Sequence, residues 1–301
     1  MHDTLSQIPS PCYVLEEELL RRNLALIRSV KEAAGVNIIL AFKAYALWKS
    51  FPVIREYIPH STASSIHEAR LAFEEMGSPA HTYSPAYTER DFPTILKYSS
   101  HITFNSLTQF ERFYPQVVAD GNRVSCGLRI NPEYSEVETD LYNPCAPGSR
   151  LGIPADKLPE LPQGVEGLHF HTLCEQDSDA LETTLDAVAK KFGDILPNMK
   201  WLNFGGGHHI TRPGYDIRRL EDCIRRAQET WQVAVYLEPG EACALNAGYL
   251  VTSVLDLPEN GDTRLAILDM SAACHTPDVI EMPYCPPIYG AGEAGKKAVT
   301  Y

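Results

Sequence analysis

The sequence lacks the features of secreted and membrane-spanning proteins. Its eight cysteines include no CxxC pair, so it indicates neither a zinc ribbon nor a disulfide framework. No apolar run approaches the length of a transmembrane helix. The first residues, Met-His-Asp-Thr-Leu-Ser, lack the basic and apolar segments of a secretory signal. We therefore predict a cytoplasmic protein with free thiols.

Positive charge is also scarce. The 301 residues carry 26 Lys and Arg against 39 Asp and Glu, which gives a formal net charge of −13. Such a surface disfavours nucleic acid and anionic membranes as partners, although an acidic surface most often serves only solubility. If the charge has a role in recognition, it suits a small cationic molecule.

The alternation of apolar and amphipathic segments predicts a barrel. Between about residues 37 and 237, short apolar runs alternate with longer amphipathic ones, which is typical of βαβ units. Eight such repeats predict a closed (β/α)8 TIM barrel. The eight candidate strands are Ile38–Phe42, Ser61–Ala63, His81–Tyr83, Ile102–Phe104, Val124–Ile130, Gly167–His171, Trp201–Phe204 and Val233–Leu237.

Amphipathic stretches between these strands predict helices. Ser65, followed three residues later by Glu68, is typical of a capping box at the start of one of them. The candidate helices are Glu16–Ala33, Ile66–Met76, Ser178–Phe192 and Arg218–Thr230.

The pattern changes after residue 240. Gly248–Asp256 and Arg264–Asp269 are rich in β-formers with no helix between them, and Asp256–Asp262 supplies turn residues. Pro11–Leu15 is also typical of a strand, which could pair with these late strands. We predict a barrel over residues 16–247 and a β-domain formed by residues 1–15 and 248–301.

Lys43 directly follows the apolar run 37–42. The carboxyl ends of barrel strands form the face where such enzymes place their chemistry. A partly desolvated amine at this face can lose its proton and form a Schiff base with an aldehyde cofactor. The alternative is a lysine that simply extends its ammonium into solvent.

Gly205, Gly206 and Gly207 directly follow the seventh predicted strand. Without Cβ atoms, consecutive backbone N–H groups can turn toward an anion. The phosphate site of many barrels involves the loops after strands seven and eight, where these glycines fall. An ordinary flexible turn is the alternative. We interpret His208 and His209 as part of the packing of this loop.

Charged and aromatic side chains end three other predicted strands. Glu238 could face a cofactor ring nitrogen and keep it protonated, or form a salt bridge. His169 and His171 share one strand face, where an imidazole could stack on a flat ring, bind a metal or be structural. No acidic or Cys partner stands at clear ligand spacing, so we predict no metal site. Arg129 offers a cationic fork for a carboxylate, or is a surface residue.

Taken together, these motifs resemble the alanine racemase-like (fold type III) pyridoxal-phosphate decarboxylases. The motifs occur in the same order as in that family, and the resemblance covers essentially the whole chain. Within the family, the sequence is most similar to the carboxynorspermidine (carboxyspermidine) decarboxylase branch, through segments 169–175, 205–209, 269–278 and 281–284. The motifs that carry the family resemblance are Ala41-Phe-Lys-Ala44, Gly127-Leu-Arg-Ile-Asn-Pro132, His169-Phe-His171, Asn203-Phe-Gly-Gly-Gly207 and Glu238-Pro-Gly240.

The resemblance implies a role for each of these residues. Lys43 would hold pyridoxal 5'-phosphate, His171 would stack on its ring, and Glu238 would pair with the ring nitrogen. The phosphate would lie at Gly205–Gly207. Further residues are implied around the ring, namely Arg129 and Glu68, and at the substrate, namely Glu241, His275 and Asp278.

The implied reaction is decarboxylation of carboxynorspermidine or carboxyspermidine in polyamine biosynthesis, by a homodimer. The alternatives are a decarboxylase of diaminopimelate or another basic amino acid, and a catalytically silent relative that binds the cofactor. Diaminopimelate and ornithine decarboxylases usually carry Arg where this chain has Glu241. An acid at this position argues against those two activities and could help tolerate a cationic polyamine tail.

The sequence also departs from the family at its end. Family members continue through further strands that carry a Cys and an acidic residue, whereas this chain stops at Tyr301. We therefore expect a β-domain truncated at its C-terminus, and cofactor binding rather than full turnover.

Overall fold

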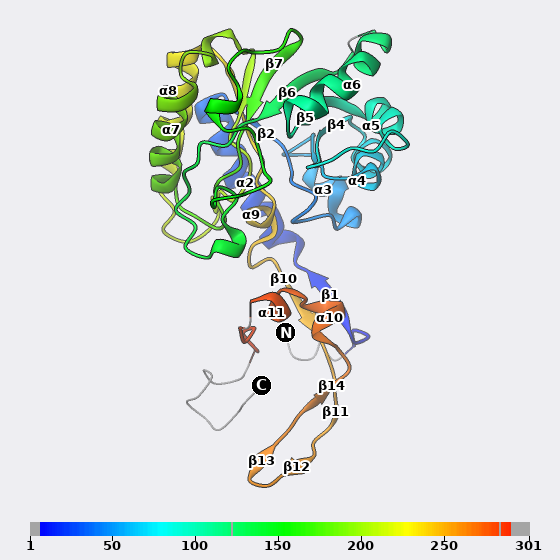
Figure 1. Cartoon of the computed structure of the whole chain (residues 1–301). Coiled ribbons are helices and arrows are strands. Elements are labelled where there is room, and N and C mark those ends of the chain that lie inside the picture. Colours follow the sequence, from blue (N-terminus) through cyan, green and yellow to red (C-terminus); the bar gives the residue numbers. More distant parts are fainter. Residues whose placement is uncertain (1–6, 122, 283, 290–301) are drawn as a thin grey trace. The chain divides into compact units, whose positions relative to one another are not determined.

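The computed structural model describes residues 7–121, 123–282 and 284–289 (Figure 1). The chain divides into two compact units, which are residues 18–246 and residues 1–17 with 247–301. Parts of the predicted β-domain, 1–6 and 290–301, lie outside the described residues. The predicted domain boundaries and the truncation of the β-domain stay predictions.

Eight parallel strands form one sheet in the larger unit, in the order β2-β9-β8-β7-β6-β5-β4-β3. Hydrogen bonds join its two edges, because Leu40 just after β2 pairs in parallel with Ser61 just before β3. The Leu40 amide donates to the His60 carbonyl (3.0 Å), and the Thr62 amide donates to the Leu40 carbonyl (2.8 Å). The predicted TIM barrel is confirmed. Its strands are β2 (Asn37–Ile38), β3 (Thr62–Ala63), β4 (Ala80–Tyr83), β5 (Ser99–Phe104), β6 (Ser125–Arg129), β7 (Val165–His169), β8 (Trp201–Asn203) and β9 (Ala234–Leu237).

Helices lie outside the strands in Figure 1. The α-helices of this unit are α2 (Glu17–Ala34, which begins at the unit boundary), α3 (Phe51–Ile54), α4 (Ile66–Leu71), α5 (Phe92–Tyr98), α6 (Leu107–Ala119), α7 (Ser178–Phe192), α8 (Ile217–Trp231) and α9 (Glu241–Ala244). Five shorter helical segments are η1 (Trp48–Ser50), the π-helix η2 (Ala72–Met76), η3 (Asp140–Tyr142), η4 (Ala155–Lys157) and η5 (Leu196–Asn198). The predicted helix over Ile66–Met76 therefore changes from α to π geometry after Leu71.

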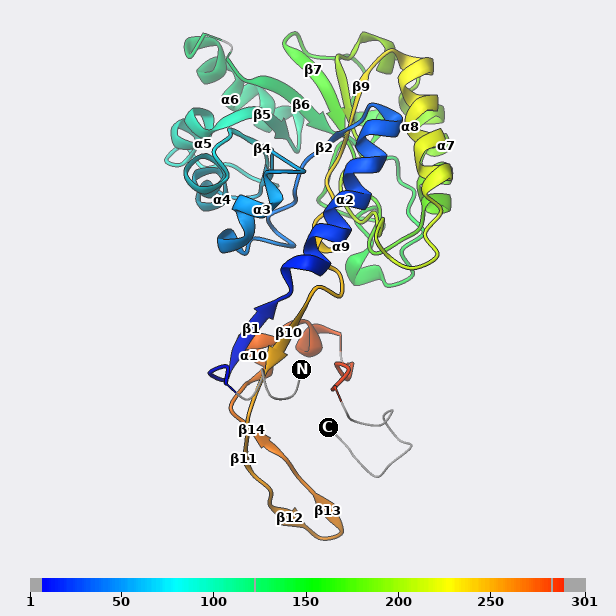
Figure 2. The same cartoon turned by 180° about the vertical axis from the view of Figure 1, so that it is seen from behind.

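Helix α8 illustrates why these segments are helical. It buries Leu220, Ile224 and Ala227, which share one face at helical spacing. Its polar face reaches the end of α2, where Arg225 donates to the Ala33 carbonyl (3.4 Å), and the two helices lie side by side in Figure 2.

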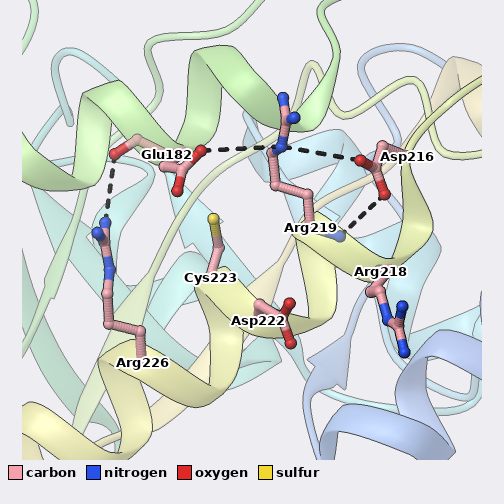
Figure 3. Close-up of a pocket in the computed structure, with 7 residues that line it drawn as sticks. All are labelled: Glu182, Asp216, Arg218, Arg219, Asp222, Cys223 and Arg226. Carbon is pink, nitrogen blue, oxygen red and sulfur yellow. Dashed lines mark hydrogen bonds and ion pairs between the residues drawn. The ribbon is translucent and has the colours of Figure 1, made fainter.

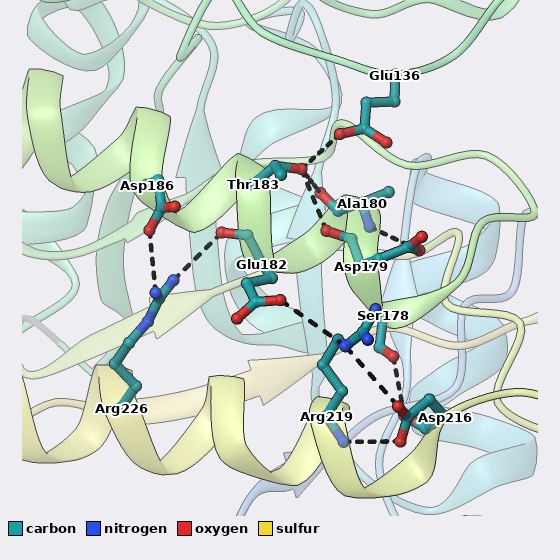
Figure 4. Close-up of polar contacts among 10 residues, drawn as sticks. All are labelled: Glu136, Ser178, Asp179, Ala180, Glu182, Thr183, Asp186, Asp216, Arg219 and Arg226. Carbon is teal, nitrogen blue, oxygen red and sulfur yellow. Dashed lines mark hydrogen bonds and ion pairs between the residues drawn. The ribbon is translucent and has the colours of Figure 1, made fainter.

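Ion pairs join α7 to α8 on the outer surface (Figure 4). Arg226 pairs with Asp186 (3.0 Å) and Arg219 with Glu182 (3.8 Å). A surface hollow of about 290 Å³ lies over these helices (Figure 3). It is lined by Glu182, Asp216, Arg218, Arg219, Asp222, Cys223 and Arg226. Within the hollow, Glu182 and Asp216 pair with Arg219, whereas Asp222 and Arg226 pair with residues outside it. We therefore interpret it as a packing feature between two outer helices rather than an active site.

The first barrel strand is shorter than predicted. The sequence predicts a strand over Ile38–Phe42, whereas β2 ends at Ile38 and residues 42–44 form a turn. The Ala41 carbonyl accepts hydrogen bonds from the amides of Ala44 and Tyr45, both at 3.1 Å, and these bonds close the turn. Lys43 therefore lies within a turn rather than at a strand end.

Two glycines make room for a tryptophan in the barrel. Gly127 on β6, Gly167 on β7 and Trp201 on β8 pair in register. A Cβ atom on Gly127 or Gly167 would lie 2.2 Å or 2.0 Å from the Trp201 ring. The indole N–H donates to Ser125 Oγ (2.9 Å). These positions therefore require glycine because the ring crosses directly over both.

Aromatic rings fill the barrel interior beside this tryptophan. His81 stacks on His101 with ring centroids 3.8 Å apart, and His101 lies 5.7 Å from Tyr236. His101 belongs to β5 and Tyr236 to β9, which are not neighbours in the sheet. The contact between them must therefore cross the interior of the barrel.

The smaller unit is rich in antiparallel strands, as predicted. β1 (Cys12–Leu15) pairs with β10 (Gly248–Val251), so the N-terminal strand does join the late strands. A hairpin follows, in which β11 (Val254–Asp256) pairs with β14 (Ile267–Leu268), and β12 (Glu259–Asn260) pairs with β13 (Thr263–Arg264). Gly261 adopts φ +60° at its tip. Two short helices that the sequence analysis did not predict, α10 (Ala272–His275) and α11 (Asp278–Glu281), follow the hairpin. In the described chain, neither unit has a helix with the length and apolar character needed to cross a bilayer.

Candidate active site

The turn that carries Lys43 is fastened to the loop after β9. The Ala41 amide donates to the Pro239 carbonyl (3.0 Å), which continues the pairing of β2 with β9. A Cβ atom on Gly240 would lie 2.5 Å from the Cβ of Ala44. Glycine at 240 therefore lets these two loops meet at the carboxyl end of the barrel.

Lys43 is accessible to solvent, yet protein surrounds it on most sides. This burial lowers the pKa of its amine, the negative charge of Glu238 opposes the shift, and the positive charge of Arg129 adds to it. The net shift is downward, so more of the amine is neutral at a given pH than in a free lysine. A reactive amine needs both properties, access to a substrate and a share of the unprotonated form.

Glu238 follows β9 and is almost enclosed. Its Oε1 accepts a hydrogen bond from Asn203 Nδ2 (2.8 Å), and its Oε2 lies 3.6 Å from His169 Nε2. Burial by itself would raise the pKa of this carboxyl, but His169, Asn203 and Lys43 together hold the pKa below its usual value. Burial lowers the pKa of His169, so at neutral pH the partner of the carboxylate is a neutral imidazole. Glu238 is thus an ionised carboxylate inside the barrel mouth.

His171 lies beyond the end of β7 and contacts the glycine loop. Its Nδ1 accepts a hydrogen bond from the Gly206 amide (3.0 Å), so its own proton must be on Nε2. Burial, followed by the positive charges of Lys43 and Arg129, places the pKa of His171 well below its usual value. The interaction with Lys43 and the bond to Gly206 place the lysine and the glycine loop at the same end of the barrel.

Arg129, at the end of β6, is buried, so the alternative of a surface arginine is wrong. Its guanidinium lies 4.8 Å from the centre of the Tyr83 ring, and Nη2 donates to the His171 carbonyl (3.1 Å). The ring of His169 also stacks on the Tyr83 ring, with the two centroids 5.4 Å apart. Arg129 therefore positions the His171 segment from within the protein.

Glu68 is engaged at the start of α4. The Ser65 hydroxyl accepts a hydrogen bond from the Glu68 amide (3.2 Å), as the capping box predicts. The Glu68 carboxylate accepts from the Ser64 amide (2.6 Å) rather than from Ser65. It also lies close enough to Lys43 to raise the pKa of that amine slightly against the burial effect.

The three glycines are required by close packing. A Cβ atom would lie 2.5 Å from the Phe170 carbonyl oxygen at Gly205, 2.7 Å from the Glu238 carbonyl oxygen at Gly206, and 2.2 Å from the Leu173 carbonyl oxygen at Gly207. The backbone is also left-handed at Gly205 (φ +71°) and Gly207 (φ +83°).

Two of the three glycine amides already have partners. The Gly205 amide donates to Asn203 Oδ1 (2.9 Å), and the Gly206 amide donates to His171. The amides of Gly207 and His208 have no hydrogen-bond partner in the described part of the chain. The loop thus offers an anion these two N–H groups rather than three glycine amides.

The residues predicted to bind substrate fall in both units. Glu241 begins α9 directly after the loop that meets the Lys43 turn, and its side chain is half exposed. His275 and Asp278 belong to the smaller unit, in α10 and at the start of α11. There, the Tyr13 hydroxyl donates to the His275 carbonyl. Their predicted role stays a prediction.

His169 and Asn203 are site residues that the sequence analysis did not assign. Both contact Glu238 directly. The period-2 alternation that puts His169 on the same face as His171 was a signal for the histidine. Asn203, in the motif before the glycines, gave no signal of its own, because an amide at the end of a strand fits many roles.

Comparisons with known proteins identify the family of this chain. No protein-family model matches the chain. A carboxyaminopropylagmatine decarboxylase from Synechocystis is 46% identical over 289 residues, which cover 95% of this chain and 74% of the relative. A carboxynorspermidine/carboxyspermidine decarboxylase from Campylobacter jejuni is 44% identical over 286 residues, with 95% and 74% covered. The chain belongs to the carboxynorspermidine decarboxylase family.

Solved structures of decarboxylases share the fold. The carboxynorspermidine decarboxylase of Campylobacter jejuni, complexed with norspermidine, superposes with a TM-score of 0.84 at 43% identity, over 92% of this chain and 72% of that one. SrLDC, solved with PLP and cadaverine, has a TM-score of 0.69 at 18% identity over 90% and 71%. As a member of the carboxynorspermidine decarboxylase family, the protein is a decarboxylase.

Proposed function

We propose that this protein decarboxylates carboxynorspermidine or carboxyspermidine with the help of pyridoxal 5'-phosphate, as a step in polyamine biosynthesis. The observation that carries the proposal is the convergence of Lys43, His171 and Glu238 at one end of the barrel, in a chain 44% identical to a decarboxylase of these compounds. The homodimer and the cytoplasmic location remain predictions.

The residues present fit pyridoxal 5'-phosphate. Lys43 supplies an accessible amine of lowered pKa for an aldehyde. Glu238 supplies a buried carboxylate that stays ionised and can face a ring nitrogen. The unpartnered amides of Gly207 and His208 can receive a phosphate. When bound, the cofactor supplies the electron sink for the loss of carbon dioxide.

The chain's own residues supply position and charge. The Glu238 carboxylate, fixed by Asn203, stabilises a proton on a ring nitrogen placed beside it. The neutral His171 ring, held at Nδ1 by the Gly206 amide, offers a flat apolar face and an Nε2 proton, while Arg129 holds the His171 backbone carbonyl. Burial lowers the pKa of the Lys43 amine, so the amine loses a proton more readily than a free lysine does and can act as a base.

A second candidate substrate is carboxyaminopropylagmatine. The relative from Synechocystis that carries this name is 46% identical, which is as similar as the Campylobacter protein. The two kinds of substrate differ at the far end, where one has an ammonium and the other a guanidinium. Diaminopimelate is disfavoured, since Glu241 would stand near its second carboxylate.

The test is release of carbon dioxide by the cofactor-loaded protein from carboxynorspermidine, carboxyspermidine, carboxyaminopropylagmatine and diaminopimelate, each supplied separately. We expect kcat/KM to be highest for the first two. The variant Lys43→Ala should lose both the absorbance of the bound cofactor and the activity. A cofactor absorbance that depends on Lys43, without carbon dioxide from any of the four compounds, would identify a catalytically silent relative and refute the proposal.

A further inference from the structure

Loops that follow three neighbouring barrel strands bring two carboxylates and an imidazole together. Glu175 follows β7, His209 follows β8, and Glu241 follows β9. Their ligand atoms, one from each side chain, all lie within 4.8 Å of one another. His209 Nε2 is 3.4 Å from Glu241 Oε1. We call these three residues the acidic triad.

His209 is the buried member of the acidic triad, and its ring lacks a hydrogen bond. The residue is only 7% exposed, and neither ring nitrogen has a hydrogen-bond partner in the described chain. A buried polar group left without a partner costs on the order of 1–3 kcal/mol. An imidazole in this position, aimed between two carboxylates, therefore indicates a missing ligand rather than packing alone.

The backbone around the acidic triad is fixed. The Gln176 amide donates to the Gly207 carbonyl (3.1 Å), and the His209 amide donates to the Gln176 carbonyl (3.3 Å), so the two loops are bonded side by side. Glu175 adopts φ +52°, which is unfavourable for a residue with a Cβ. Its carbonyl accepts a hydrogen bond from Arg212 Nη1 (3.2 Å), which holds the loop in this conformation.

The acidic triad lies near the reactive amine. Cys174, next to Glu175, interacts electrostatically with both Glu241 and Lys43. Two carboxylates and an imidazole nitrogen offer three hydrogen-bond acceptors and two negative charges. The complementary ligand carries a positive charge and several N–H donors at one small centre.

We propose that Glu175, His209 and Glu241 bind the cationic nitrogen group at the far end of the substrate, an ammonium or a guanidinium, while its amino acid end lies at Lys43. This inference rests on the proposed function and names the residues that recognise the tail. Where diaminopimelate and ornithine decarboxylases usually carry an arginine, this chain then has Glu241 as part of a site for a cation. Glu175, and His209 that the sequence analysis interpreted as packing, then become specificity-determining residues.

The experiment measures binding of three amines to the cofactor-loaded protein by calorimetry. Norspermidine has an ammonium at its far end, aminopropylagmatine has a guanidinium there, and N-propyl-1,3-diaminopropane has a methyl group instead. The variants are Glu175→Gln, Glu241→Gln and the double variant. Glu241→Asp keeps the charge on a shorter side chain and tests whether the position of the carboxylate matters. Glu229→Gln, an exposed glutamate on α8, is the matched control. Cofactor absorbance and melting temperature are recorded for every variant.

We expect each Gln variant to weaken binding of the cationic-tailed amine by about tenfold, the double variant by more, and the control by less than about twofold. N-propyl-1,3-diaminopropane should bind all variants about equally. Whichever of norspermidine and aminopropylagmatine loses more affinity identifies the tail that the acidic triad accepts. Undiminished preference for a cationic tail in the double variant would overturn the proposal.

A metal titration tests whether the ligand of the acidic triad is a metal ion instead of the cationic end of the substrate. If Zn²⁺ binds the wild type at micromolar concentration, is lost in the Gln variants, and leaves the preference among the three amines unchanged, the acidic triad is a metal site and the proposal is wrong. Failure of the proposed function has a different signature, because the wild type would then release no carbon dioxide from any candidate substrate. If the wild type releases carbon dioxide but the double variant keeps the same preference among the three amines, only the tail assignment is refuted.

Discussion

The stacked histidines inside the barrel predict that acid weakens the fold well before carboxylates are protonated. Burial, helped by the positive charge of His60 and opposed by Glu166, lowers the pKa of His101 to about 4. In the unfolded chain a histidine has a pKa of about 6.5. Below pH 6.5 the unfolded state therefore binds more protons than the native state, so stability falls as pH falls, down to about pH 4.

The size of the effect follows from the two pKa values. Between pH 7 and pH 5, a group with pKa values of about 6.5 unfolded and about 4 folded removes about 2 kcal/mol from the free energy of unfolding. His81, stacked 3.8 Å from His101, has its pKa lowered well below the usual value by burial and then by His101, so it adds to the loss. The substitution His101→Phe keeps an aromatic ring and removes one titrating group.

The assay is urea unfolding of the cofactor-free protein at pH 7 and pH 5, followed by circular dichroism. Cofactor-free protein is used because ligand binding would add its own pH dependence. The loss of stability between the two pH values should be about 2 kcal/mol smaller in His101→Phe than in the wild type. An equal loss in both proteins would show that His101 is not held neutral in the native state.

Three further predictions test the barrel and the site. Gly167→Ala places a methyl group 2.0 Å from the Trp201 ring and should lower the free energy of unfolding by about 2–3 kcal/mol in urea, whereas Gly214→Ala, with open space around its Cβ position, should show only the cost of its positive φ. Glu238→Gln keeps an oxygen for Asn203 but removes the charge, so carbon dioxide release should fall by about a hundredfold while the cofactor stays bound; an unchanged kcat would refute the role. Glu241→Arg should shift preference from carboxynorspermidine toward diaminopimelate, and unchanged discrimination between the two would contradict a role for this residue in specificity.

The barrel could be predicted because its strands are buried and its helices amphipathic. All eight strands occur where short apolar runs predict them, and helix α7 has the predicted bounds, Ser178–Phe192. The strand ends were less predictable. Phe42 is apolar because it packs on Phe51, with centroids 4.9 Å apart, and not because it belongs to a strand. An apolar run alone does not distinguish the two.

The candidate site was predictable at the residues whose types are unusual directly after an apolar run. Lys43, His171 and Glu238 meet as the motifs indicate. The contacts among them were not predictable, since they depend on which loops are neighbours in the closed barrel. Asn203 is the example, because its amide connects Glu238 to the Gly205 amide and neither bond has a signature in the sequence.

The glycine loop shows why one motif can have two physical causes. Each of the three glycines faces a carbonyl oxygen closer than any Cβ atom could approach, so packing alone requires all three. The anion-binding interpretation, by contrast, depends on free N–H groups, and the only unpartnered amides among the described residues of the 205–208 segment are those of Gly207 and His208. The first two glycines thus bring the loop against His171 and Glu238, and the amides that follow are the ones left facing no partner. The Gly206 amide contributes differently, because by donating to His171 it fixes the tautomer and orientation of the ring that flanks Lys43. The motif therefore couples the end of the site that offers free N–H groups to its aromatic side through a single hydrogen bond.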